Sequence, residues 1–296
     1  MNFLFIFKAI IIAIVEGLTE FVPVSSTGHM ILVGDLINFR NSTIPQASQF
    51  AEMYEVVIQL GAILAVVVLY RKKIFGSIVE FFNYIIGFIK KDKSLVKKSE
   101  TGFKFGINVI LGSLPAMFFG LVLYDKIKGL FNTDSVAIAF IVGGILLVII
   151  ESWYMQNRKK RREAKSVDEI TYKQSLLVGF FQCLAMWPGM SRSASTIMGG
   201  WVAGFNTTVA TEFTFFLAIP AMIGSSALDL LKFDYSIMNS TYWVALILGF
   251  IVAFIVSLIV IERFISYLKK KPMRVFAVYR VCAGIVLAVL LFTKII

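Results

Sequence analysis

Residues 16–29 gather the side chains of this chain that are best suited to chemistry, including its only histidine. The stretch reads Glu16-Gly17-Leu18-Thr19-Glu20-Phe21-Val22-Pro23-Val24-Ser25-Ser26-Thr27-Gly28-His29. The surrounding sequence is apolar, and an ionisable side chain costs about 2.5–3.5 kcal/mol at the centre of a membrane-inserted helix. A cluster of such groups therefore indicates a functional site.

Glu16 and Glu20 lie four residues apart, which places both carboxylates on one face of a helix. Like charges at this spacing repel unless a cation lies between them. Because Mg²⁺ and Ca²⁺ prefer oxygen ligands, the pair can hold either ion against a phosphate, or one carboxylate can act as a base. The alternative is that both side chains line a water-filled vestibule.

Three hydroxyl residues, Ser25, Ser26 and Thr27, begin the next predicted helix after a break at Pro23. Exposed backbone N–H groups at a helix start form an anion site. His29 lies three residues beyond Ser26, close enough to act as a proton carrier or nucleophile. The alternatives are N-capping for the hydroxyls and a structural hydrogen bond for His29.

A second polar cluster follows Pro188-Gly189 at another predicted helix start. Its members are Ser191, Arg192, Ser193, Ser195 and Thr196. Arginine stays charged when buried, and its planar fork of donors fits phosphate. The alternative partner of Arg192 is Glu16 or Glu20, and such an ion pair can be the resting state of the same site. Together the two clusters supply the groups needed for phosphoryl transfer.

The elements that must position these residues are membrane helices. The 296-residue chain is 58% hydrophobic, with a mean hydropathy of +0.83, which is typical of a polytopic membrane protein. Its net charge of +11 comes from short basic clusters between apolar segments, so we expect a bilayer and no nucleic acid as its partner. The predicted spans are 54–70, 105–124, 135–154, 209–231, 243–261 and 275–292, with an interfacial helix at 74–89.

Two further apolar regions, 3–37 and 175–205, are each interrupted by a proline and small hydroxyl residues. Each half is short for a crossing, and broken backbone at membrane depth needs protein or water around it. Both regions are therefore predicted as re-entrant hairpins, giving an all-α fold of six transmembrane helices and two hairpins. Cys183 and Cys282 lie far apart, so neither a metal site nor a redox pair is indicated.

Basic residues gather in three loops, at 71–98, 158–165 and 263–274. The positive-inside rule puts these loops in the cytoplasm, and the loops 35–52, 125–134 and 232–240 and both termini outside. The single membrane domain, 1–296, then divides into an inverted-topology repeat of 1–155 and 174–296, each a hairpin followed by three spans. The hairpins enter from opposite sides, and their tips are expected to meet.

The two motifs together resemble those of the bacterial undecaprenyl-pyrophosphate phosphatase family, also known as the bacitracin-resistance protein family. The glutamate-rich signature of that family corresponds here to residues 16–29. Its second signature reads Pro188-Gly189-Met190-Ser191-Arg192-Ser193-Ala194-Ser195-Thr196. The resemblance extends over the whole chain, and no motif position departs from the pattern.

The resemblance implies an enzyme of the bacterial plasma (inner) membrane whose active site opens to the outer side. It implies hydrolysis of undecaprenyl diphosphate to undecaprenyl phosphate and inorganic phosphate, which recycles the lipid carrier for cell-wall synthesis. Bacitracin would oppose such an enzyme by sequestering its substrate. A divalent cation would assist the reaction. The sequence leaves a homodimer open.

By the same likeness, Glu16 and Glu20 handle the metal or a proton. Ser26 and His29 handle the attack, and Arg192 binds the diphosphate. Ser26, His29 and water remain open as the nucleophile; we favour Ser26, with Glu20 or His29 as its base. The other hydroxyls expected to bind substrate are Ser25, Thr27, Ser191, Ser193 and Thr196.

A secondary transporter or lipid flippase for a phosphate-bearing ligand is the alternative function, because inverted repeats with broken helices are also typical of carriers. A carrier has no need of a hydroxyl nucleophile. A lipid phosphatase that uses two histidines is excluded, since His29 is the only one. Elsewhere, Gln59 and Gln182 are expected to have structural roles, and Arg280 to lie near the interface or in an ion pair.

Overall fold

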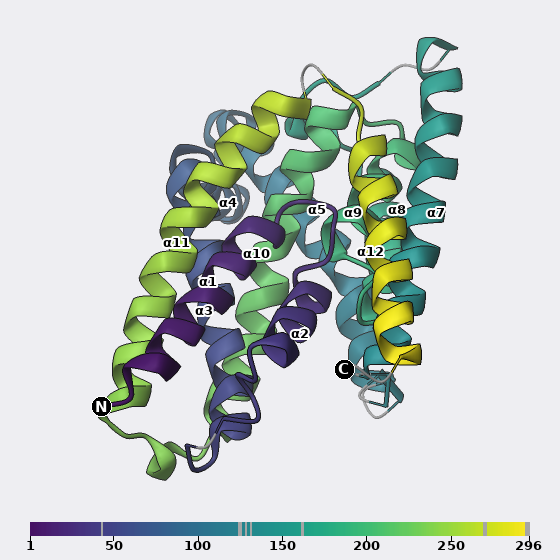
Figure 1. Ribbon diagram of the computed structural model, residues 1–296. Coiled ribbons are helices and arrows are strands. Elements are labelled where there is room, and N and C mark those ends of the chain that lie inside the picture. Colours follow the sequence, from purple (N-terminus) through teal and green to yellow (C-terminus); the bar gives the residue numbers. More distant parts are fainter. Residues whose placement is uncertain are drawn as a thin grey trace.

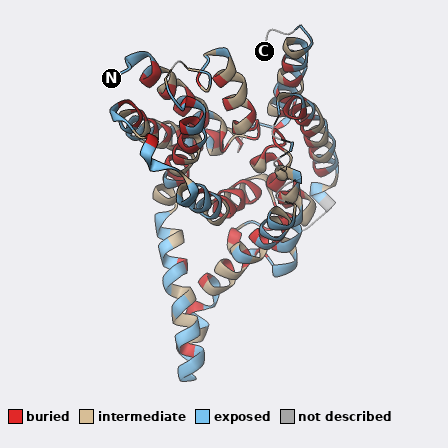
Figure 2. Ribbon diagram, turned by 90° about the horizontal axis from the view of Figure 1, so that it is seen from below, coloured by how far each residue is buried: buried red, intermediate tan, exposed pale blue. Residues whose placement is uncertain are grey.

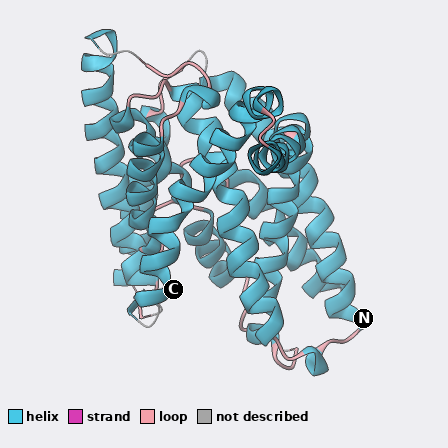
Figure 3. Cartoon of the chain, turned by 180° about the vertical axis from the view of Figure 1, so that it is seen from behind, coloured by secondary structure: helices cyan, strands magenta, loops and turns pink. Residues whose placement is uncertain are grey.

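The computed structural model describes residues 1–42, 44–123, 126–127, 129–130, 132–160, 163–268 and 271–293 (Figure 1). Positions 43, 124, 125, 128, 131, 161, 162, 269, 270 and 294–296, several of which fall in predicted loops, lie outside the described residues. The described part of the chain is all-helical and contains no β-strand, as predicted. Loops gather at the two ends of the bundle, with short breaks inside it (Figure 3).

Among the residues that the structure describes, six helices are long and apolar enough to cross a bilayer. They are α3 (Ala47–Leu69), α5 (Lys93–Val122), α7 (Thr133–Asn157), α10 (Thr207–Lys232), α11 (Ser240–Leu268) and α12 (Arg274–Phe292). Each overlaps one predicted span, so the six-span prediction is confirmed and the protein is a multi-pass membrane protein. Figure 1 shows α7 and α12 together on one side of the bundle and α3 and α11 on the other.

The helix predicted as interfacial is α4 (Arg71–Lys90), which folds back along the beginning of α5. Asp92 caps α5 by accepting hydrogen bonds from two backbone N–H groups, at 3.0 and 3.1 Å. Tyr84 of α4 stacks on Phe103 of α5, with ring centroids 4.0 Å apart. This pairing explains why α5 begins well before residue 105, the predicted start of that span. Contact of α4 with a membrane surface stays a prediction.

Four shorter helices form two helix pairs, α1 (Phe3–Thr19) with α2 (Ser26–Leu36) and α8 (Tyr172–Gln182) with α9 (Arg192–Ala203). Each pair folds back on itself. Phe5 near the start of α1 stacks on Phe39 just after α2, with centroids 5.1 Å apart. Gln174 near the start of α8 donates a hydrogen bond to Ala203 O at the end of α9, at 2.8 Å. That these hairpins enter the membrane without crossing it stays a prediction.

Each hairpin packs against a helix from the other half of the chain. Ser257 of α11 donates to Gly17 O of α1 at 3.5 Å, and Ser175 of α8 donates to Asn108 O of α5 at 2.5 Å. Gly17 permits the close approach of α1 to α11, because a Cβ there would lie 2.8 Å from Val256 Cβ. This packing of each hairpin against the other half of the chain agrees with the expected inverted repeat. The division into 1–155 and 174–296 stays a prediction.

The predicted basic loops lie at one end of the bundle. Lys73, near the start of α4, forms an ion pair with Asp168. Arg274, at the start of α12, donates to Ser152 near the end of α7 at 2.9 Å. At the other end of the bundle, where α1 and α11 both begin, Asn2 N donates to Thr241 Oγ1 at 3.0 Å.

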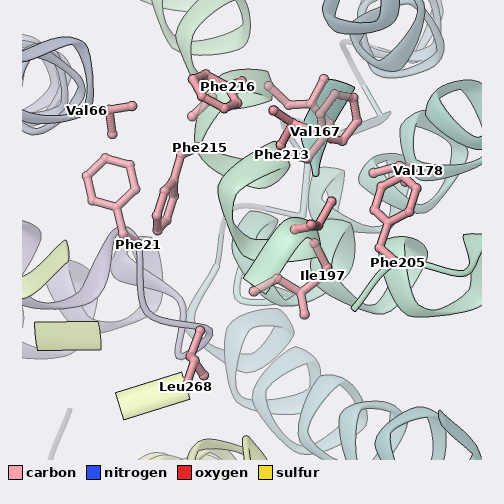
Figure 4. Packing of buried hydrophobic residues seen from close by; sticks show 14 of the residues in the cluster. Phe21, Val66, Val167, Val178, Ile197, Phe205, Phe213, Phe215, Phe216 and Leu268 are labelled. Carbon is pink, nitrogen blue, oxygen red and sulfur yellow. The ribbon is translucent and has the colours of Figure 1, made fainter. Parts of the chain in front are cut away.

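Buried residues gather where the helices meet, and exposed residues follow the outer surfaces (Figure 2). The larger apolar cluster surrounds the break after α1. Phe21 lies edge-on to Phe215 of α10, with centroids 5.4 Å apart (Figure 4). Ile197 of α9 belongs to the same fully buried cluster. Since aromatic packing of this kind fixes side-chain geometry, the polar residues nearby have a rigid support.

Candidate functional site

The break that follows α1 meets the start of α9. Arg192 Nη2 donates to Glu20 Oε1 at 3.0 Å, although the two residues are 172 positions apart. Ser193 Oγ donates to the backbone oxygen of Val22, also at 3.0 Å. The expected meeting of the two tips is confirmed, and the two polar clusters form one site.

Both tips contain a serine in the same unusual backbone conformation. Ser25 has φ +73° and Ser191 has φ +70°, and each is the N-cap residue of the helix that follows. Their hydroxyls accept hydrogen bonds from Gly28 N at 3.5 Å and Ala194 N at 3.2 Å. Non-glycine residues in such regions cost about 1–3 kcal/mol and cluster at functional sites. Each tip therefore contains one strained serine, directly before the N-terminus of α2 or α9.

A cavity of about 210 Å³ lies between the tips. This volume equals that of about seven water molecules at about 30 Å³ each, enough for a small anion but not for a lipid chain. Its polar lining consists of Glu20, Ser25, Ser26, Thr27, Gln59, Ser191, Arg192 and Ser225. The remaining lining residues are Ala185, Met186, Pro188, Gly189, Ala221 and Met222.

Glu20 connects the two tips through both of its carboxylate oxygens. Oε1 accepts the hydrogen bond from Arg192, and Oε2 accepts one from the Ser26 hydroxyl. Arg192 is held from its other side, because its Nη1 donates to Thr214 O of α10 at 3.0 Å. A hydroxyl that donates to a carboxylate can act as a nucleophile with the carboxylate as its base, and the Arg192 guanidinium also contacts this carboxylate.

Glu16 lies one turn before Glu20 but does not line the cavity. Its side chain is fully buried, and neither carboxylate oxygen has a hydrogen-bond partner among the described residues. Gln182, which was expected to have a structural role, is also buried on α8, with its Oε1 without a partner. Buried oxygens of this kind are rare and require an explanation.

His29 lies behind the first tip and is not among the lining residues of the cavity. Its Nδ1 is 2.7 Å from Ser25 O, and its Nε2 is 2.6 Å from the Tyr279 hydroxyl of α12. The imidazole also stacks on the Tyr279 ring, with centroids 5.6 Å apart. In this arrangement His29 fixes the backbone of Ser25, and its role in the attack stays a prediction.

Ser193 and Thr196 also contact the protein rather than the cavity. Thr196 Oγ1 donates to Arg192 O at 2.9 Å and accepts a hydrogen bond from Thr214 Oγ1 at 2.8 Å. Ser193 bonds to the first tip, as described above. The structure therefore places Ser25, Thr27, Ser191 and Arg192 of the predicted substrate-binding set at the cavity and these two behind it.

Arg280, expected near the interface or paired, has partners that the sequence did not indicate. Its side chain is fully buried on α12, and it forms no ion pair with a described carboxylate. Nη2 donates to Gly189 O at 3.0 Å and Ala139 O at 3.2 Å. Gly143 makes room for it, because a Cβ there would lie 2.1 Å from Nη2. Arg280 thus holds the turn of the second tip from behind.

Gln59 and Ser225 line the cavity, and the sequence interpretation did not assign them to it. Gln59 lies on α3 and Ser225 on α10, the spans that follow the two hairpins. A polar residue inside an apolar span was the available signal for Gln59.

Comparison with known proteins agrees with these motifs. The family described as bacitracin resistance protein BacA matches residues 9–286. A Clostridium perfringens (strain 13 / Type A) protein named undecaprenyl-diphosphatase is 67% identical over 100% of this chain and 99% of its own. A Clostridioides difficile (strain 630) protein named undecaprenyl-diphosphatase 2 is 60% identical over 100% and 98%. This chain belongs to the bacitracin resistance protein BacA family.

Proposed function

We propose that this protein hydrolyses undecaprenyl diphosphate to undecaprenyl phosphate and inorganic phosphate. The observation that carries the proposal is the contact of Ser26, Glu20 and Arg192 at one cavity. Relatives that carry the name undecaprenyl-diphosphatase match the chain over its whole length and support it. In a bacterium this activity recycles the lipid carrier for cell-wall synthesis and confers resistance to bacitracin.

The positions of the three side chains support the following chemistry. Ser26 Oγ attacks the terminal phosphorus of the diphosphate, and Glu20 accepts the hydroxyl proton. The bond from that phosphorus to the bridging oxygen breaks, and undecaprenyl phosphate leaves. Water then cleaves the phosphoserine, which restores the Ser26 hydroxyl and releases inorganic phosphate. Arg192 neutralises charge on the transferred group throughout.

The two helix starts supply the remaining contacts with the head group. The first backbone N–H groups of α2 and α9 lie beside the cavity, where a helix N-terminus favours an anion. Ser25, Thr27 and Ser191 line the cavity beside them. Ser193 and Thr196 act indirectly, because they hold the two tips in place.

The experiment that tests the function uses purified protein in detergent, where transport across a membrane has no meaning. We expect release of inorganic phosphate from undecaprenyl diphosphate, and its loss in Ser26→Ala but not in Thr19→Ala, whose hydroxyl bonds only to Val15 O, at 2.6 Å. Correctly folded protein that binds the lipid but releases no phosphate would favour a transporter or flippase.

We also propose that the carboxylates of Glu16 and Glu20 would hold a divalent cation, Mg²⁺ or Ca²⁺. The described residues contain no group of three or more acidic, histidine or cysteine side chains that lie close enough together to hold a metal ion. Mg²⁺, however, is commonly held by one or two carboxylates together with substrate phosphates. Among the described residues, no donor bonds to the oxygens of Glu16, and Glu20 lines the cavity. When bound, the cation would neutralise charge on the diphosphate.

Removal of the cation with EDTA should lower activity at least about 100-fold, since metal ions contribute several kcal/mol to such reactions and about 1.4 kcal/mol is tenfold in rate. Added Mg²⁺ or Ca²⁺ should restore activity. In Glu16→Gln, the Mg²⁺ concentration that gives half-maximal activity should rise at least about tenfold, because loss of even an outer-shell partner lowers metal affinity about 10- to 100-fold. Full activity in EDTA would remove the cation from the mechanism.

We further propose that the protein lies in the bacterial plasma membrane with its cavity open to the outer side. The end that carries the basic loops then faces the cytoplasm. In a variant without Cys183 and Cys282, Ser236→Cys should react with an impermeant thiol reagent on intact cells. Lys159→Cys should react only after lysis. The reverse pattern would invert this orientation.

A further inference from the structure

The polar cavity has room for the head group but not for the chain of a polyprenyl lipid, which must leave the site along apolar surface. A second cavity, of about 360 Å³, lies beside the first. It is formed by the end of α5, by described residues between 123 and 130, and by η3 (Cys183–Met186), which follows α8. Its lining consists of Phe119, Leu123, Lys126, Ile127, Leu130, Cys183, Met186 and Trp187.

The two cavities share one wall. Met186 lines both of them, and Trp187 on the apolar side directly precedes Pro188 on the polar side. The Trp187 indole is held in place, because its Nε1 donates to Ser135 Oγ of α7 at 2.8 Å. If the diphosphate of the lipid lies beside Ser191 and Arg192, the apolar side chains of the second cavity therefore lie on the other side of η3 from it.

A larger apolar cavity elsewhere shares no lining residue with the polar cavity, although its Pro220 and Ile223 are sequence neighbours of Ala221 and Met222. It measures about 460 Å³ and lies between α4, α5 and α10, lined by residues that include Phe82, Ile110 and Ile223. The larger volume favours this cavity, whereas the shared lining residue Met186 favours the smaller one.

Building on the proposed function, we propose that the cavity between α5 and η3, which we call the tail groove, binds the first isoprene units of the substrate. The chain passes Met186 and continues along Leu123 into the bilayer. Because a lipid chain is already in an apolar medium, its transfer into the groove gives little hydrophobic free energy. The groove therefore orients the diphosphate toward Ser26 rather than supplying most of the affinity.

Cys183 provides a reporter inside the tail groove, and the other cysteine, Cys282 of α12, is exposed. In Cys282→Ser protein in detergent, we expect undecaprenyl phosphate to slow alkylation of Cys183 about tenfold, as one occupied site would at about ten times its Kd. Inorganic phosphate alone should not slow it. The matched control carries Cys183→Ser, Cys282→Ser and Ile223→Cys, which places the reporter in the larger apolar cavity. Its alkylation should be the same with and without the lipid.

A second variant keeps the test independent of the reactivity of Cys183. Leu123→Cys, in protein without the native cysteines, reports from the α5 wall of the groove and should show the same protection. Phosphate release is measured in the same preparations. If the enzyme is active but the lipid protects neither reporter cysteine from alkylation, the proposed tail groove is wrong and the proposed function is unaffected. If the lipid protects both reporter cysteines in folded protein that releases no phosphate, the groove is a lipid site and the proposed phosphatase function is wrong.

Discussion

Arg192→Lys is expected to lower kcat/KM about 100- to 1,000-fold, the loss that follows removal of one well-placed donor from a transition-state site. Arg192 uses one guanidinium nitrogen for Thr214 O and another for Glu20, each at 3.0 Å. A lysine ammonium is a single point charge and cannot reproduce this planar arrangement. Phosphate release from undecaprenyl diphosphate by purified protein measures the effect.

The control for this variant is Arg274→Lys. Arg274 also donates to a protein oxygen, that of Ser152, but it lies at the end of the bundle that carries the basic loops. We expect its activity to stay close to that of the original protein. Both variants should be recovered from the membrane in similar amounts. Near-normal turnover by Arg192→Lys would remove Arg192 from diphosphate binding.

Glu20→Gln should lower kcat by about 1,000-fold or more, because the substitution removes both the proton acceptor for Ser26 and the counter-charge of Arg192. Loss of one partner of a buried ion pair also costs about 3–5 kcal/mol of stability. Thermal unfolding must therefore be recorded with activity. Addition of a tightly binding phosphate analogue should restore stability but not turnover.

Glu80→Gln is the matched control for loss of a carboxylate. Glu80 Oε2 accepts a hydrogen bond from Gly102 N at 2.7 Å, where α4 packs on α5. This variant is expected to lose some stability and keep its activity. If Glu20→Gln remains active while folded, Glu20 is not the base, and His29 or water must take the proton from Ser26.

The polar clusters were predictable because ionisable groups are conspicuous in an apolar sequence. The contact of Arg192 with Glu20 was anticipated as an ion pair, and the two helix breaks were placed by their prolines. The six spans followed from hydropathy alone, since length and apolar composition decide which helices cross.

The surroundings of His29 and Arg280 were not predictable in the same way. Both depend on how α12 packs against the tips, through Tyr279 in one case and Gly143 in the other. Nothing local to these residues indicates such contacts, because they join segments that are 91 to 250 positions apart in the sequence. The sequence likewise gave no sign that Glu16 would lie outside the cavity.

Ser25 and Ser191 have matching backbone conformations at the two tips. Each serine fixes the first turn of its helix, so the residues that follow, Ser26 and Arg192, occupy equivalent places in the two tips. An assembly of two identical halves would present two hydroxyls or two cations there. A single continuous chain can let its two tips diverge, so that in the proposed mechanism one tip carries the attacking group and the other carries the charge that binds the phosphate.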